Sequence, residues 1–293
     1  MLRTIERYAD TYGMLPASGG AVAVGVSGGA DSMCLLDVLL RLGKERGFGV
    51  TALHYNHKVR GDASDADEGF VRDYCLERGV EFINGQAPAI ERVTEDSLRK
   101  LRYGFFADSG FSTIALAHHS DDNAENFIMR LKGIPPVREG FIRPLLCVSK
   151  AEILRYNDKY FVPNITDDSN SDTVYTRNFV RSGIMPLINN INPQFAKAVF
   201  GKTEQERSDD SFLRSLAEPY IDESSRKVLA ELHTALLSRV LLIKGERLGI
   251  TFYREQILSA IELLNGSKAV WELPLSGKIC LKCKFDRVSW VRA

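Results

Sequence analysis

The sequence predicts an α/β fold: a doubly wound parallel sheet, followed by a second, smaller α+β domain. Two observations predict it. Short apolar runs alternate with segments of helical periodicity, an order typical of parallel strands with helices on both faces. The runs are 21–26, 50–55, 80–83 and 113–117, and the helical segments are 31–43, 64–78, 95–108 and 120–132. Length is the second observation, because 293 residues that are 44% hydrophobic can form one large core and a smaller one.

A change in composition predicts where the two domains meet. Residues 200–210 are polar and densely charged, as in a solvated linker or the exposed face of a connecting helix. We therefore expect a first domain over 1–205 and a second over 206–293. The second domain should contain a helical pair at about 224–244 and 253–265 and short strands around 271–273, 279–284 and 288–291.

Two serines mark expected helix starts. Ser64 precedes Asp67 by three residues, and Ser149 precedes Glu152 by the same distance, which is the spacing of a capping box. In a parallel sheet, ligands bind beyond the carboxyl ends of the strands, near the point where the strand order reverses. We therefore expect the chemistry in the turns that follow the strands.

The composition excludes several classes of protein. The 38 basic and 38 acidic residues cancel, so any RNA site must be a local patch. The start of the chain lacks the apolar segment of a signal peptide, and no apolar run approaches the roughly 20 residues of a membrane-spanning helix. These features predict a cytoplasmic protein with no membrane partner.

The cysteines favour a reducing compartment. There are five of them, an odd count, and they lie among apolar neighbours, unlike a disulfide framework. Cys280 and Cys283 form one CxxC, a spacing used in zinc and iron–sulfur sites, but no second pair lies nearby. We expect these two to be ordinary residues of a short strand, with a metal role as the alternative.

The turn after the first expected strand has the composition of a phosphate-binding loop. In residues 25–32, GVSGGADS, backbone N–H groups and the positive end of the helix dipole would face an anion. It is not a Walker A loop, because Ala30 and Asp31 stand where the second glycine and the lysine would be. The candidate nucleotide ligands are Ser27, Gly28, Gly29, Ala30, Asp31 and Ser32, and Asp31 is also a candidate ligand of Mg²⁺.

Polar clusters follow the second and fourth expected strands as well. Asp121 or Asp122 lies three or four positions before Glu125 at a helix start, so these carboxylates project from one face. They can hold an ammonium group or Mg²⁺, or simply complement the helix dipole. The candidate site residues in the two clusters are Asn56, His57, Arg60, His118, His119, Asp121, Asp122 and Glu125.

Arginines one helical turn apart occur twice. Arg99 and Arg102 could clamp phosphates or stabilise a charged adenylate, or they could be solvated surface residues. Arg177 and Arg181, with Asn178 between them, lie on one helical face that suits an RNA backbone or a triphosphate. Both pairs are therefore candidate anion contacts.

These segments resemble the tRNA(Ile)-lysidine synthases of the pyrophosphatase-loop superfamily, whose fold is adenine nucleotide alpha hydrolase-like. The superfamily shares the SGGxDS loop, whereas HHxDDxAE and YxRNxxR narrow the resemblance to the family. The motifs run in order over about residues 20–195: SGGADS at 27–32, HxNHxxRG at 54–61, RxxRY at 99–103, AHHxDDxAE at 117–125, RPLL at 143–146, DSN at 168–170 and YxRNxxR at 175–181.

The resemblance implies a ligase that uses ATP and Mg²⁺ to modify the wobble cytidine of a tRNA(Ile) with a CAU anticodon. ATP would adenylate the ring carbonyl oxygen, and free lysine would then displace AMP to give lysidine. Residues 1–205 would be the ATP-binding catalytic domain and 206–293 a tRNA-binding domain. A homodimer is compatible with this family.

The resemblance also implies a role for each matched residue. The serines and glycines of the loop, with Asp31, would bind ATP. The catalytic set would be Asp31, Arg102, Asp122 and Glu125, with Arg102 stabilising the adenylate and phosphates. Asp122 and Glu125 would hold lysine, while Arg177 and Arg181 would bind phosphate or RNA.

The chain departs from the family in two places. The connection 133–141 is shorter than the usual glycine-rich loop, and a third domain is not seen, so tRNA selection would rest on 206–293. Within it, the basic segment 278–293 fits RNA contact or a small solvated sheet equally well. Two alternatives stay open: a tRNA thiolase of the same superfamily, favoured by the CxxC pair, and a non-catalytic nucleotide- or RNA-binding relative, favoured by the short connection.

Overall fold

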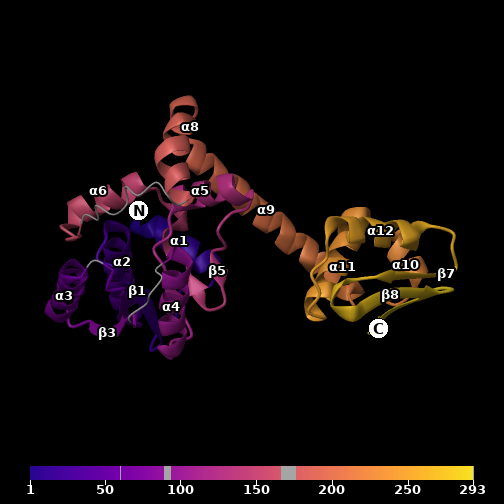
Figure 1. Cartoon of the computed structure of the whole chain (residues 1–293), viewed down its shortest axis with the longest axis horizontal. Helices are drawn as coiled ribbons and strands as arrows, with labels where there is room; N and C mark the ends of the chain where they lie inside the picture. Colours follow the sequence, from indigo (N-terminus) through magenta and orange to yellow (C-terminus); the bar gives the residue numbers. More distant parts are fainter. Residues whose placement is uncertain (60, 89–93, 166–175, 293) are drawn as a thin grey trace. The chain divides into compact units, whose positions relative to one another are not determined.

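The computed structural model describes residues 1–59, 61–88, 94–165 and 176–292. The chain divides into two compact units, 1–203 and 204–293 (Figure 1). The boundary falls within helix α9 (Phe195–Ala217), so the charged stretch after residue 200 is helical. The functions expected of the two domains stay predictions.

A six-stranded sheet forms the centre of the first unit, in the order β3-β2-β1-β4-β6-β5. The pairs among β1, β2, β3, β4 and β6 are parallel, as predicted, whereas β5 pairs antiparallel with β6 at the edge. This edge hairpin was not predicted, because two-residue strands show no periodicity. The strands are β1 (Ala21–Gly25), β2 (Gly49–Asn56), β3 (Glu81–Gln86), β4 (Ile114–Ala115), β5 (Val137–Arg138) and β6 (Phe141–Ile142).

The strand order reverses between β1 and β4. From β1 the chain adds β2 and then β3 on one side, and β4 on the other, with Ala23 opposite Thr51 of β2 and Ile114 of β4. Connections leave these strands in opposite directions, which opens a crevice at their carboxyl ends. The glycine-rich turn after β1 and the HHSDDNAE segment after β4 both begin at this crevice.

The sheet is covered on both faces. Val22 and Val24 of β1 belong to one core, whereas Ala23 belongs to another with Phe106 of helix α4 (Glu95–Asp108), and all three β1 residues are completely buried. Successive side chains of a strand point to opposite faces. A continuous apolar run rather than an alternating one therefore marks this strand, and the predicted doubly wound sheet is confirmed.

Eight helices before α9 lie in the described part of the first unit, and one of the two expected capping boxes is present. Ser149 caps α6, with Glu152 accepting from the Ser149 N–H at 2.9 Å. The capping box predicted at Ser64 is wrong, because α3 begins two residues earlier, at Asp62. The residue before the helix is Gly61, which has a φ of 53°. The helices are α1 (Leu2–Thr11), α2 (Ala30–Arg46), α3 (Asp62–Glu77), α4 (Glu95–Asp108), α5 (Ser120–Arg130), α6 (Lys150–Tyr160), α7 (Thr176–Phe179) and α8 (Met185–Ile191), with a 3₁₀ turn η1 (Pro144–Cys147) and a π-helical turn η3 (Val180–Ile184).

The second unit packs helices against a three-stranded antiparallel sheet of order β7-β8-β9, which confirms a smaller α+β part. The single helix expected over 224–244 is wrong: Leu232 leaves the helical region, and His233 caps a new helix by accepting from the Ala235 N–H at 3.2 Å. The elements are η4 (Glu218–Tyr220), α10 (Arg226–Glu231), α11 (Thr234–Arg247), α12 (Arg254–Asn265), β7 (Val270–Pro274), η5 (Ser276–Lys278), β8 (Ile279–Lys284) and β9 (Arg287–Arg292). Within the described residues, no helix has the length and apolar character to cross a membrane.

Candidate active site

A cavity of about 640 Å³ lies at the carboxyl ends of β1, β2 and β4. The fold brings to it motifs that are far apart in the sequence. Predicted site residues in its lining are Ser27, Gly29, Asp31, Ser32, Asn56, His57, Arg102, His118, Asp122, Arg177, Asn178 and Arg181. The predicted residues Gly28, Ala30, His119, Asp121 and Glu125 are not part of the lining surface. Arg60, the DSN motif at 168–170 and Tyr175 lie outside the described residues.

The glycine-rich turn is held in one conformation by its own serines. The Ser32 hydroxyl accepts from the Ser27 N–H at 3.1 Å and donates to the Gly29 carbonyl at 3.0 Å. Gly28 has a φ of +88°, and a Cβ there would lie 2.9 Å from Ile165 Cδ1. Gly29 caps α2 without a side-chain hydrogen bond, so the first N–H groups of this 17-residue helix lack a side-chain cap. An anion is the ligand that such an end favours.

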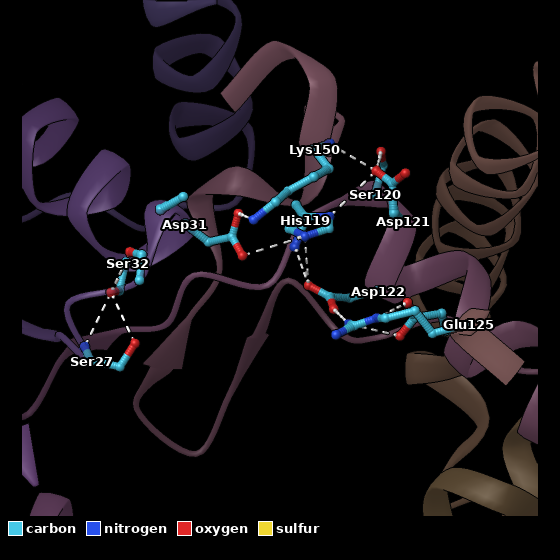
Figure 2. A network of polar contacts seen from close by, with 12 residues as sticks. Ser27, Asp31, Ser32, His119, Ser120, Asp121, Asp122, Glu125 and Lys150 are labelled. Atoms are coloured by element: carbon cyan, nitrogen blue, oxygen red, sulfur yellow. Dashed lines mark hydrogen bonds and ion pairs between the residues drawn. The ribbon is translucent and has the colours of Figure 1, made fainter. Parts of the chain in front are cut away.

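Asp31, at the first turn of α2, faces a lysine and a histidine. Lys150 Nζ lies 2.6 Å from Asp31 Oδ1, and His119 Nε2 lies 3.8 Å from Asp31 Oδ2. In Figure 2, dashed lines join the Asp31 carboxylate to both of these side chains. The Lys150 backbone N–H also donates to Asp121 at 2.9 Å, which links α6 to α5. Sequence reasoning missed Lys150, because it lies 119 positions from Asp31 and its only local signal is the capping box beside it.

The residues at the turn fit Mg²⁺ bound together with phosphates. Mg²⁺ prefers oxygen ligands and is commonly held by one or two carboxylates plus phosphate oxygens and water. Asp31 offers one carboxylate at the cavity wall, with the Ser32 hydroxyl beside it. Among the described residues, no group of three or more His, Cys, Asp or Glu side chains is placed to hold a metal ion. Phosphate oxygens would therefore have to supply part of the Mg²⁺ coordination.

Asp122 and Glu125 form the most buried charged cluster of the site. They lie one turn apart on α5, as predicted, and are 7% and 3% exposed. Arg177 donates from Nη2 to Asp122 at 2.8 Å and from Nε to Glu125 at 3.0 Å. Arg181 donates from Nε to Glu125 at 2.7 Å and from Nη2 to both carboxylates at 3.1 Å. Sequence reasoning predicted the carboxylate pair and the arginine pair, but not that they would contact each other.

The positive groups around Asp122 keep it ionised. Burial opposes ionisation, but the charges of His119 and Arg177 hold the pKa of the Asp122 carboxyl below its usual value. Its Oδ2 atom also accepts from the His119 backbone N–H at 2.9 Å. A buried carboxylate with this environment binds cations, whether from the protein or from a ligand.

Two histidines of the cavity are neutral at physiological pH. Burial and the Arg102 charge lower the pKa of His57 to about 4, and burial also holds the pKa of His118 well below its usual value. The Nδ1 atoms of both rings are buried and have no hydrogen-bond partner in the described structure. Each ring can therefore give or take a neutral hydrogen bond with a ligand.

Asn56 has a structural role. Its amide donates to Asp65 at 2.8 Å and to Glu68 at 3.0 Å, both on α3. Glu68, which sequence reasoning missed, also accepts from Asn84 of β3 at 2.8 Å. Asn56 thus ties the end of β2 to α3 and shapes the wall of the cavity.

Of the two arginines on α4, only Arg102 lines the cavity. The Arg99 guanidinium carbon lies 5.0 Å from the centre of the Tyr103 ring and Nη2 lies 3.4 Å from its hydroxyl, so Arg99 packs along its own helix. The position of Arg102 is compatible with an anion contact, whereas that of Arg99 matches the surface alternative.

Four of the five cysteines are buried, and burial raises the pKa of the Cys34, Cys75 and Cys283 thiols. Burial raises the pKa of Cys34, inside α2, to about 12. Cys280 and Cys283 lie on β8 and are 7% and 1% exposed, and both thiols are free. This burial fits residues of a small core and does not favour a reactive pair.

Comparison with known proteins supports the family resemblance that the motifs indicate. Residues 3–188 match the model of the PP-loop domain family. The chain is 36% identical over 239 residues to a tRNA(Ile)-lysidine synthase of Geobacter sulfurreducens, covering 74% of this chain and 50% of that protein. It is 38% identical over 224 residues to the enzyme of that name from Parabacteroides distasonis, covering 70% and 50%. The chain therefore spans about half the length of the curated relatives it matches.

A solved structure shares the fold. A U34-tRNA thiolase from Methanococcus maripaludis, solved with its iron–sulfur cluster, superposes with a TM-score of 0.53 and covers 69% of this chain and 77% of its own. The two sequences are only 18% identical, so the likeness concerns the fold and not the reaction.

Proposed function

Because the chain belongs to the PP-loop family, we propose that it attaches free lysine to the wobble cytidine of a tRNA(Ile) with a CAU anticodon, using ATP and forming lysidine. The names of the relatives support this reaction. One observation carries it: a buried pair of carboxylates, Asp122 and Glu125, adjoins the cavity that the glycine-rich turn also lines. An anion site and an ammonium site then lie within reach of one base.

The first step would transfer AMP to the base. The ring carbonyl oxygen of cytidine attacks the α-phosphorus of ATP, the bond to the β-phosphate oxygen breaks, and pyrophosphate leaves. The N–H groups of the turn and the Arg102 guanidinium would stabilise the phosphate charge. Asp31 would hold Mg²⁺, which neutralises phosphate charge when bound. The anticodon loop is single-stranded, so the base can leave its stack at low cost.

The second step would form the carbon–nitrogen bond. Asp122 and Glu125 would hold the side-chain ammonium of lysine, which passes a proton to solvent water before it can attack. The free amine then attacks the ring carbon that bears the adenylated oxygen, the carbon–oxygen bond breaks, and AMP leaves. Adenylation is needed because a ring carbonyl oxygen is otherwise a poor leaving group.

The test is product analysis with all three substrates. Protein incubated with ATP, radiolabelled lysine and a CAU-anticodon tRNA(Ile) is expected to label the RNA and to release AMP and pyrophosphate. Asp31→Ala should abolish the label, whereas Arg3→Gln, a change at an exposed arginine of α1, should retain it. Release of ADP, or no label in RNA, contradicts the proposal.

The thiolase alternative makes a different prediction. A sulfur-transfer enzyme needs reactive thiols or an iron–sulfur cluster, and the CxxC pair is the feature of this chain that favours one. Full lysine transfer after replacement of Cys280 and Cys283 by serine would exclude the thiolase reading. Free lysine as a partner, a homodimer and a cytoplasmic location stay predictions.

A further inference from the structure

We infer that Arg177 and Arg181 close the lysine site until an anionic substrate enters, so that lysine binds only after the nucleotide. This inference rests on the proposed function, because it takes Asp122 and Glu125 as the lysine-binding groups. It concerns the order in which the substrates bind, and it follows from how the four side chains meet.

Every carboxylate oxygen of the pair already has a donor. Glu125 accepts on both oxygens from the two guanidinium groups, and Asp122 Oδ1 accepts from both as well. The other Asp122 oxygen accepts from the His119 backbone N–H at 2.9 Å. The printed hydrogen bonds leave about one free lone pair on each carboxylate. An incoming ammonium group has three N–H donors, so it would find enough acceptors here only if a guanidinium moved away.

The charges of the cluster also cancel. Two carboxylates face two guanidinium groups, so the cluster has no excess negative charge with which to attract a third cation. The carboxylates are buried, and a cation that left water for this place would not recover its hydration energy. While these contacts are in place, the arginines therefore exclude free lysine.

The same arginines are placed to leave when a polyphosphate arrives. Both line the cavity together with Ser27 and Gly29 of the glycine-rich turn. Their side chains are 28% and 40% exposed, unlike the carboxylates that they contact. A guanidinium binds phosphate in the same forked geometry as carboxylate, and a triphosphate offers more acceptor oxygens and more negative charge. Transfer of one or both arginines to the nucleotide would free the carboxylates for the ammonium of lysine.

The experiment is a lysine titration by calorimetry, with the whole protein alone and saturated with α,β-methylene-ATP and Mg²⁺, an analogue that cannot release pyrophosphate. We expect at least tenfold tighter lysine binding in the presence of the analogue. Because coupling is reciprocal, lysine should tighten analogue binding by the same factor. Norleucine, which lacks only the side-chain amino group of lysine, should show no such coupling.

Two variants distinguish the specific effect of Arg177 on lysine binding from the general effect of removing one positive charge. Arg177→Gln should tighten lysine binding in the absence of the nucleotide. The ratio of the lysine dissociation constants without and with the analogue should therefore fall below threefold. Arg3→Gln is the matched control, since it breaks an arginine–glutamate pair of 2.7 Å outside the cavity, and it should keep the wild-type ratio. If Arg177→Gln does not fold, the wild-type ratio alone decides.

Two results overturn the inference and are distinct from failure of the proposed function. Lysine that binds equally well with and without the analogue refutes the closed site, even if lysine is transferred to RNA. A wild-type ratio in folded Arg177→Gln refutes the role of that arginine. In contrast, no lysine binding in any state together with no labelled RNA refutes the proposed function itself.

Discussion

Glu125→Gln removes one of the two negative charges of the Asp122–Glu125 pair with almost no change in shape. Glu125 is 3% exposed and accepts hydrogen bonds of 2.7–3.1 Å from Arg177 and Arg181. Removing one partner from a fully buried ion pair costs about 3–5 kcal/mol. Both guanidinium groups here are partly exposed, so solvent screens them, and we expect about 1–2 kcal/mol less stability towards unfolding.

The effect on lysine should be larger than the effect on stability. A charge-assisted hydrogen bond contributes about 1.5–3 kcal/mol, so the KM for lysine should rise by roughly 10- to 150-fold. Formation of adenylated RNA without lysine should change less than about threefold, because Glu125 does not line the cavity. The assays are urea denaturation, steady-state kinetics with varied lysine, and single-turnover adenylation.

Glu6→Gln is the matched control for this change. Glu6 is 8% exposed and accepts from Arg3 and Arg46 at 2.7 Å, so it is also a buried glutamate between two arginines. It lies on α1, away from the cavity, and its replacement should lower stability without changing the KM for lysine. An unchanged KM in Glu125→Gln, or an equal change in both variants, would refute the reasoning.

Three further predictions concern the nucleotide and pH. Gly28→Ala forces a side chain to adopt a φ of +88° against Ile165, and should cost about 1–2 kcal/mol of stability and weaken ATP binding more than tenfold; calorimetry that finds wild-type affinity contradicts this. Lys150→Met leaves the Asp31 carboxylate without its ammonium partner. The carboxylate should then repel the phosphates of ATP and weaken ATP binding, chiefly in the absence of Mg²⁺. An equal loss of affinity in the presence of Mg²⁺ would argue against charge repulsion as the cause. The folded-state pKa of His57 is about 4, below the unfolded value near 6.5, so the unfolded chain binds the proton first and stability falls by up to about 3 kcal/mol as pH drops from 6.5 to 4. His57→Gln should flatten that part of the pH–stability curve, and an unchanged slope in denaturation at several pH values counts against it.

The parts of the fold that local patterns encode could be predicted from the sequence. The run around Val22 indicated a strand buried on both faces, and the Ser149 capping box marked the start of α6. The one-turn spacing of Asp122 and Glu125 placed both carboxylates on one side of α5. Each of these depends on residues within a few positions of one another.

Contacts between distant segments could not be predicted in the same way. The Lys150–Asp31 pair joins α6 to α2, and the Arg177–Glu125 pair joins α7 to α5. Nothing near either residue in the chain indicates its partner, because each contact depends on how elements far apart in the sequence pack together. The start of α3 was missed for another reason: the conformation of Gly61 outweighed the capping signal at Ser64.

The most direct test of the central claim follows the α-phosphate of ATP. With ATP labelled at that phosphate and a CAU-anticodon tRNA(Ile), but no lysine, we predict that the label accumulates on the RNA. Lysine added afterwards should release all of it as AMP and leave one lysine per RNA. Label that never enters the RNA, or that appears as ADP, would contradict the transfer of AMP to the base.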